Sequence, residues 1–592
     1  MRSSTRCGSP TRRGAWIVAV FLTGCYAGAH GDGGDAGTAA DDGDDTGADT
    51  AADTGDDGVD TDGIPSGCDA DTPPAAALLR MHRDNYVHAL ESVFGAAALE
   101  PVRATIETLP SASMGVFATE VPPVGFSEVS AYFNIASQLA FDLTKDAASL
   151  TALHACLGSV PPGADAGSDA CLVGFIDTFG ARLLRRPLTD EDRSRFAGDF
   201  AVGGAHSVGE GAATVLVAML LDPRFLYFVE TEGEEIAPGV LELTSHELAA
   251  RLARVLWDSV PDDELLAAAA NAEGGRLEGD ALRDQIDRML DDERARVALS
   301  RFAGNWLALD VMPQPSAALF PDADAREAAR VAMKAELLDF IEAVTLDRDG
   351  TYADLLLDRT ASFDAPELGQ IYGVTPGQDV TLPDDRAGLL TRAGWLATNE
   401  VIRSNAGHII KRGRRLGEFL CRPVPPPDPG NFPTEDPADP ATNPDVGIRE
   451  RFNAAASEPQ CAGCHQILDG YGAPFGHYGA AGQWIDVEQI DVDGTAVDVS
   501  IDAASMLELD DVVAVDGARA LSEAIAASDV GPQCLAEQLT RNIVARPLAE
   551  SDGCLEQTAR IALAPQDGAP QSLRDTIVAL VSSPHFRQVT LP

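Results

Sequence analysis

The residues best suited to chemistry in this chain are two cysteines and a histidine in the run Cys461-Ala462-Gly463-Cys464-His465. Two thiols three positions apart, with a histidine directly after the second, form the spacing by which a polypeptide attaches a c-type haem. The thiols add to the porphyrin vinyl groups, and the imidazole becomes an axial ligand of the iron. The spacing therefore predicts one covalent haem c, held by Cys461 and Cys464 and ligated by His465.

Two other interpretations of these cysteines stay open. A redox-active CxxC normally lies between a strand and a helix of a βαβ unit, and the surrounding sequence shows no such pattern. A zinc site requires a second pair of ligands, and neither a second CxxC nor an HxxxH occurs in the chain. If the pair formed a disulfide or a metal clip, the protein would be a surface binding or scaffold lipoprotein instead of an electron carrier.

A haem iron has a second axial position, for which the sequence offers two candidates. Met506 follows His465 at a separation compatible with the methionine ligand of small cytochromes c, and a methionine would raise the reduction potential. His477 is closer in sequence, and a bis-histidine site would usually have a lower potential. An iron without a second protein ligand would favour ligand sensing or peroxidase-like chemistry.

The charge balance of the chain limits the choice of partner. There are 93 Asp and Glu residues against 43 Lys and Arg, so the formal net charge is −50. Binding to nucleic acid requires a basic face, so we expect no nucleic-acid partner. An acidic surface that keeps an exported protein soluble is the simpler interpretation.

The N-terminus has the features of an export signal. A charged stretch precedes the apolar run Ala15–Leu22, which is too short to span a membrane as a helix. The run ends in Leu22-Thr23-Gly24-Cys25, which resembles the bacterial lipobox and implies cleavage before Cys25 and lipidation of its thiol. We therefore expect an exported protein, anchored through lipid alone, at the outer membrane facing the periplasm or at the cell surface.

Local spacing also predicts disulfides, because disulfides persist in an oxidising compartment. The expected pairs are Cys156 with Cys171 and Cys534 with Cys554. Each closure would stabilise the fold by roughly 3 kcal/mol. Cys68 and Cys421 then either pair over a long range or stay free.

Several residues that could be mistaken for functional ones are assigned to ordinary structure. His82 and His88 are six residues apart and do not share a helix face, so we expect solvated side chains. Glu336 and Asp339 have no partnered base and are expected to be surface charges. Three large residues at helical spacing are expected in the core, namely Trp257, Met289 and Trp306.

The order of motifs resembles the planctomycete-type cytochrome domains and their companion domains of unknown function, a multi-domain family of exported bacterial proteins. The motifs that carry the resemblance are FIDTFGARLLRRPLTDED, DPRFLYFVE, RLARVLWDSVPDDELL, KRGRRLGEFLCRPVPPPDP and CAGCHQILDGYGAPFGHYGAAGQW. The family implies a mainly helical protein with one haem c motif and an unknown redox partner. Its attachment cysteines match Cys461 and Cys464, and its axial histidine matches His465.

This sequence departs from the family pattern directly after the motif. Family members commonly read Met-Asp-Pro-Leu-Gly where this chain has Leu468-Asp469-Gly470-Tyr471-Gly472, so that methionine is absent. Ala473-Pro474 looks like the Gly-Pro that follows the haem histidine in small cytochromes c. The resemblance implies that the Pro474 carbonyl accepts the imidazole N–H of His465 and orients the ring.

The periodicity of apolar residues is helical from Pro74 onward, which predicts a mainly α, multi-domain fold. One hairpin is expected at Ile490–Val499, where Asp493-Gly494 interrupts an alternating run. The expected segments are a lipoprotein signal peptide at 1–24, a disordered acidic tether at 25–75, helical domains at 76–150, 151–235 and 236–378, a small cytochrome c-like domain at 379–490 with a Pro-rich spacer at 421–444, and a C-terminal helical domain at 491–592.

Overall fold

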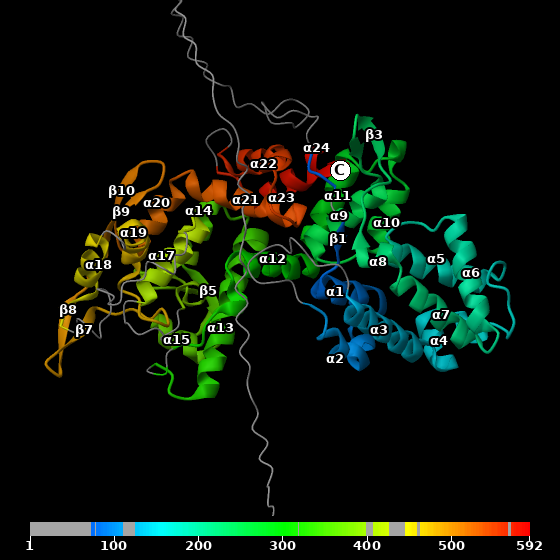
Figure 1. Ribbon diagram of the computed structural model, residues 1–592, viewed down its shortest axis with the longest axis horizontal. Coiled ribbons are helices and arrows are strands. Elements are labelled where there is room, and N and C mark those ends of the chain that lie inside the picture. The colour runs from blue at the N-terminus through cyan, green and yellow to red at the C-terminus, as the bar shows by residue number, and fades with distance from the viewer. Residues whose placement is uncertain are drawn as a thin grey trace, which may run out of the picture. The chain divides into compact units, whose positions relative to one another are not determined.

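The computed structural model describes residues 73–76, 78–110, 125–315, 317, 319–397, 407–424, 445–458, 462–565 and 570–591. The predicted signal peptide, the lipidation site Cys25, nearly all of the acidic tether, most of the Pro-rich spacer and Cys461 lie outside these residues. Over the described residues the chain is mainly α-helical with five small antiparallel sheets, as expected (Figure 1). No helix in this part of the chain has the length and apolar character needed to cross a membrane.

The N-terminal helices share one hydrophobic core, which also includes Val260. Phe175, Phe179 and Leu183 lie along one face of α5 and are buried in this core. A capping box between Thr189 and Asp192 begins α6, because each side chain accepts the backbone N–H of the other residue. The elements are β1 (Leu79–Arg80), α1 (Arg83–Phe94), α2 (Arg103–Ile106), α3 (Phe126–Thr144), α4 (Ala147–Leu153), α5 (Ala170–Leu184), α6 (Asp190–Gly204), α7 (Val208–Leu220), α8 (Pro223–Leu226) and β2 (Tyr227–Phe228).

A second, larger core extends over the rest of the chain. Trp257 and Met289 are buried in it as predicted, and the indole N–H of Trp257 donates to the Met289 carbonyl over 2.9 Å. Trp306 is partly buried against the same core. The first elements are β3 (Glu234–Ala237), β4 (Val240–Glu242), α9 (Ser245–Trp257), α10 (Asp263–Ala270), α11 (Gly279–Leu290), α12 (Glu293–Trp306), α13 (Ala323–Glu342), α14 (Tyr352–Leu357), β5 (Thr360–Phe363), α15 (Pro366–Tyr372), β6 (Gly377–Thr381), α16 (Ala393–Leu396) and α17 (Gly407–Phe419).

The predicted hairpin is present. Val492 of β7 pairs with Thr495 of β8, and the two residues between them have the positive φ angles of a tight turn, 54° at Asp493 and 80° at Gly494. The remaining elements are α18 (Ile448–Ser457), α19 (Ala462–Gly472), β7 (Val487–Val492), β8 (Thr495–Ser500), β9 (Ala504–Glu508), β10 (Val512–Asp516), α20 (Gly517–Ala526), α21 (Val530–Val544), α22 (Gly553–Leu563), α23 (Leu573–Ser582), α24 (Pro584–Arg587) and β11 (Gln588–Thr590).

Segments that are distant in sequence meet in a three-stranded sheet of order β11-β4-β3. Val589 pairs with Leu241, and Ala75 forms a bridge to Thr590. The backbone N–H of Ala76 also donates to the Thr590 carbonyl over 2.8 Å. The sheet therefore joins residues from the start, the middle and the end of the described chain.

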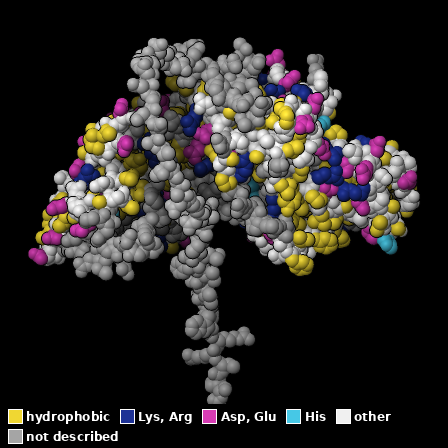
Figure 2. All heavy atoms as spheres, turned by 45° about the horizontal axis from the view of Figure 1, so that its top comes forward, with side chains coloured by type: hydrophobic (Ala, Val, Ile, Leu, Met, Phe, Trp, Pro, Cys, Tyr) yellow, Lys and Arg dark blue, Asp and Glu magenta, His cyan; other side chains and the backbone are white. Residues whose placement is uncertain are grey.

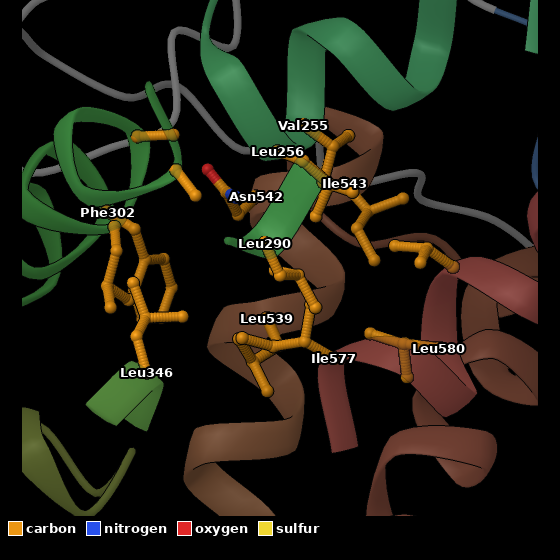
Figure 3. A pocket seen from close by; sticks show the side chains of 14 residues that line it. Val255, Leu256, Leu290, Phe302, Leu346, Leu539, Asn542, Ile543, Ile577 and Leu580 are labelled. Atoms are coloured by element: carbon orange, nitrogen blue, oxygen red, sulfur yellow. The ribbon is translucent and has the colours of Figure 1, made fainter. Parts of the chain in front are cut away.

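Helices α9, α11, α12, α21 and α23 enclose a small pocket of about 60 Å³ (Figure 3). Its lining is apolar except for Asn542. Several of its lining residues, including Val255, Leu539 and Ile577, are partly exposed, so the pocket is an apolar recess that opens toward the surface.

The position of Glu336 differs from the expectation of a surface charge. Instead of lying on the surface, its side chain is buried and forms an ion pair with the buried Arg392, while Tyr372 donates a hydrogen bond to it over 2.9 Å. A buried carboxylate needs such partners because burial without them is costly. Asp339 is exposed, as expected. On the face shown in Figure 2, acidic and basic side chains are intermingled.

The disulfides agree with expectation at one pair and differ at the other. Cys156 is bonded to Cys171. Cys534 is bonded to Cys421, so the expected pair Cys534–Cys554 is wrong. The two bonded residues are 113 positions apart, and they come together because the end of α17 lies against α21 in the folded chain. The Nε2 of Gln538 also donates to the Cys421 sulfur over 3.2 Å.

Candidate functional site

The candidate site lies on α19, which begins one residue after Cys461. Cys464 is half-buried, and it forms no disulfide with any cysteine that the structure describes. The next residue, His465, is also half-buried, with 17% of its side chain exposed. The thiol and the imidazole thus occupy successive positions in the first turn of one helix, as an attachment motif requires.

The imidazole of His465 has a carboxylate partner on its own helix. Its Nδ1 lies 3.3 Å from each carboxylate oxygen of Asp469, four residues further along α19. Residues at this spacing share a helix face, and only 9% of the Asp469 side chain is exposed. A carboxylate at Nδ1 helps to fix the orientation of the ring, an arrangement common in histidines that ligate metals.

Asp469 is a residue whose role the sequence interpretation missed. The expectation named the carbonyl of Pro474 as the partner of His465, whereas the structure places the Asp469 carboxylate at Nδ1. The signal was present in the sequence as a histidine and an aspartate four residues apart. Reading that spacing on a helix would have identified the pair.

Helix α17 supports α19 through a close backbone approach. A Cβ atom added at Gly413 would lie 2.0 Å from the carbonyl oxygen of Leu468. One added at Gly472 would lie 2.3 Å from the carbonyl oxygen of Ile409. Both contacts are too short for any larger residue, so glycine at these positions allows the two helices to pack tightly.

A fully buried arginine fixes the segment that follows α19. The guanidinium of Arg412, on α17, donates to the carbonyls of Tyr478 over 2.5 Å and Gly479 over 2.6 Å. It also donates to Leu396 over 2.8 Å and to Phe475 over 3.3 Å. Burial lowers the pKa of Arg412 to about 9, because the charged form loses its hydration. This one side chain therefore connects three stretches around α19.

The two candidate second ligands occupy different surroundings. Met506 is on β9 with 61% of its surface exposed. This strand lies against α19, because the Ser505 hydroxyl donates to the Gly470 carbonyl over 2.7 Å. The ring of His477 stacks on Trp484 with centroids 4.6 Å apart, and its Nδ1 lies 3.0 Å from the Ile485 carbonyl. Which of them would serve as a ligand stays a prediction.

Three family models match the chain. The models are PSD5, a protein of unknown function (DUF1595), at residues 171–230; PSD4, a protein of unknown function (DUF1592), at 243–374; and PSCyt3, a protein of unknown function (DUF1588), at 386–488. The first runs from the second residue of α5 through β2, the second from two residues before α9 through α15, and the third includes α16, α17 and α19 with the CxxCH motif. No curated protein and no solved structure matches the chain. Three successive segments of the chain are therefore similar to the PSD5, PSD4 and PSCyt3 domains, in this order, and each of these families is described as being of unknown function.

Proposed function

We propose that this protein is a c-type haem protein that transfers single electrons outside the cytoplasm. The observation that carries the proposal is the CxxCH motif at the start of α19, within the segment that matches PSCyt3. The half-buried His465, held by Asp469, is the structural feature that best supports it. The proposal includes an anchor of lipid at Cys25 and a location at the outer membrane or the cell surface.

The described residues of α19 fit a covalently attached haem. Cys464 offers a thiol and His465 an imidazole, whose Nδ1 lies against the Asp469 carboxylate. With Cys461 they supply the donor set of a c-type site. When bound, a haem would supply reversible one-electron exchange at its iron. The contribution of Asp469 is to hold the proton at Nδ1 and the orientation of the ring.

The test is to produce the exported protein in cells that have haem-attachment machinery and to measure its intact mass and visible spectrum. We expect a mass higher by one haem and the absorption bands of a covalent haem. Cys464→Ala and His465→Ala should lose the bands, whereas His206→Ala, which changes an exposed histidine in another part of the chain, should keep them.

An apoprotein mass in cells that load another haem c protein would overturn the proposal. It would leave the alternative in which the cysteines form a disulfide or metal clip of a surface binding or scaffold protein. The lipid is tested separately, because Cys25→Ser should release the protein from membranes while leaving the haem bands unchanged.

A further inference from the structure

A second cluster of titratable side chains surrounds the carboxylate of Asp258, directly after α9. Asp258 has a φ of 53°, and its side chain is fully buried. Arg301, on α12, forms an ion pair with it over 2.7 Å, and Asn85, on α1, donates a hydrogen bond to the same oxygen. The other oxygen lies 3.1 Å from the Nδ1 of His88. Helices α1 and α12 lie close to each other in Figure 1.

His82 and His88 therefore differ from the expectation of solvated side chains. The Nδ1 of His82 caps α1 by accepting the backbone N–H groups of Asp84 and Asn85 over 3.2 and 3.3 Å. Its Nε2 lies 3.1 Å from a guanidinium nitrogen of Arg301 and 3.7 Å from the Asp258 carboxylate. The sequence could not reveal this arrangement, because Asp258 is more than 160 residues away from either histidine.

The cluster forms one wall of an open cavity of about 730 Å³ between α1, α2 and α12. His88 and Arg301 line this cavity, whereas Asp258 lies behind them. The charged side chains in the lining are Arg83, Asp84, His88, Arg103, Glu107 and Arg301.

The lining is cationic although the chain as a whole is strongly acidic. Three guanidinium groups and one imidazole face two carboxylates, and the charge of Asp258 is fully enclosed. The Arg301 guanidinium lies against the Asp258 carboxylate, which leaves that oxygen unsuited to a metal cation. This charge distribution favours an anionic ligand.

Asp258 also favours the protonated form of His88, which can donate a hydrogen bond to an anion. Burial by itself lowers the pKa of His88, but the hydrogen bond and the negative charge of Asp258 outweigh burial and raise the pKa above its ordinary value of 6.5. With Nδ1 directed at Asp258, the protonated ring has its Nε2–H as the remaining donor.

We propose that this cavity binds a small oxyanion, the carboxylate or phosphate group of a ligand, through His88, Arg103 and Arg301. His88 and Arg301 are pre-oriented by a shared buried carboxylate, which reduces the entropy lost on binding. Arg103 is half-exposed at the rim and pairs with Glu100 over 3.1 Å, so it can reorient toward a ligand. The inference is independent of haem attachment.

The test is calorimetric titration of the full-length protein in a chloride buffer with two probes, inorganic phosphate and D-glucuronate. We expect one saturable site for at least one probe, and the probe that binds identifies the source of the oxyanion. Arg103→Gln should weaken binding about tenfold, because one charge-assisted hydrogen bond is lost. Arg283→Gln is the matched control, since Arg283 is equally exposed and pairs with Asp287 on its own helix, but it lies outside the cavity.

A pH series with glucuronate tests the role of His88, because a sugar carboxylate stays ionised from pH 5 to 8. Binding should weaken as the pH rises through the raised pKa of His88, and His88→Gln should weaken binding at pH 5.5 and remove that dependence. The charged and titratable groups that face or surround His88 are Asp258, Arg301, His82, Arg83, Asp84, Glu91, Arg103 and Glu107.

Three results would overturn the proposal. They are the absence of saturable binding for both probes, equal weakening by Arg283→Gln and Arg103→Gln, and binding by the unmodified protein that does not change between pH 5 and 8. Arg103→Gln keeps the proposal testable if His88→Gln misfolds, because Arg103 lies at the rim and circular dichroism can verify the fold of that variant.

Discussion

The carboxylate of Asp469 gives His465 more than a fixed orientation. If the proposed haem is bound, a negative partner at Nδ1 would strengthen the imidazole as a ligand and favour the more positive, oxidised iron. The effect comes from one pair of side chains, the half-buried His465 and the buried Asp469. It also distinguishes this site from one in which a neutral carbonyl accepts the imidazole proton.

Asp469→Asn is therefore expected to raise the reduction potential of the haem protein. A tenfold change in the relative affinity for the two oxidation states corresponds to about 59 mV for one electron, so we expect a rise of that order. Potentiometric titration of the visible bands would measure it. Asp493→Asn removes the same charge at the exposed hairpin turn and should leave the potential nearly unchanged. An unchanged or lower potential in Asp469→Asn would contradict the prediction.

At the scale of a single element, Arg412 holds the segment after α19 in place through hydrogen bonds. Its hydrogen bonds to four carbonyls depend on the fork of a guanidinium, which a lysine cannot reproduce with three donors. A buried carbonyl without a partner is costly. The position thus tolerates little besides arginine.

We expect Arg412→Lys to lower the free energy of unfolding by about 2 to 4 kcal/mol, because at least one buried carbonyl loses its donor. Urea unfolding followed by tryptophan fluorescence would measure the loss. Arg414→Lys on the same helix is the control, since Arg414 is exposed and pairs only with Glu418 four residues away among the described residues. Similar losses in both variants would refute a special role for Arg412.

The short helix α8 begins at another charged residue, Asp222. Burial raises the pKa of its carboxyl, but hydrogen bonds from Arg224 and Arg195 outweigh burial and lower the pKa from 3.8 to about 2. A lowered pKa in the folded state means that ionised Asp222 stabilises the protein above about pH 4. That stability is lost as the pH falls toward 2.

Asp222→Asn should accordingly lower the free energy of unfolding by about 1 to 2 kcal/mol at pH 6. This magnitude allows for solvent screening by the half-exposed Arg195. The difference between the two proteins should shrink between pH 4 and pH 2, as thermal unfolding at a series of pH values would show. Asp190→Asn, at a fully exposed residue in the first turn of α6, should show little difference at any pH. A constant difference between pH 6 and pH 2 for Asp222→Asn would contradict this assignment.

At the scale of the whole molecule, the disulfide between Cys421 and Cys534 connects the PSCyt3 segment to the helices that follow it. Replacing both cysteines by alanine should lower the free energy of unfolding by about 5 kcal/mol, because the bond closes a loop of over 100 residues in the unfolded chain. Removing Cys156–Cys171, a loop of 15 residues, should cost about 3 kcal/mol. Denaturant unfolding of the two double variants would compare them, and a larger loss for the short loop would contradict the loop-length argument.

Local patterns predicted the features that depend on neighbouring residues. The core positions of Trp257 and Met289 and the Asp493-Gly494 turn are all present. Each follows from spacing within a few residues, where helix or strand geometry already determines which side chains meet.

Contacts between distant segments account for the predictions that were wrong. Glu336 is buried because Arg392, 56 residues away, supplies its counter-charge. Cys534 pairs with Cys421 across 113 residues, and His88 meets Asp258 across 170. No local periodicity encodes such pairs, since they form only when separate helices pack. The same reason explains why the sequence showed the CxxCH pattern but not the contacts of Arg412 with Leu396 and Tyr478.

The sheet of β11, β4 and β3 implies an order of folding. Strand β11 lies more than 120 residues after the CxxCH motif, yet it completes a sheet that begins at Glu234. A chain that emerges from its N-terminus exposes the motif well before that sheet can close. If the chain is exported and receives a haem as proposed, this delay would leave the thiols accessible to the attachment machinery. Slow closure of the sheet would then increase the fraction of chains that receive a haem.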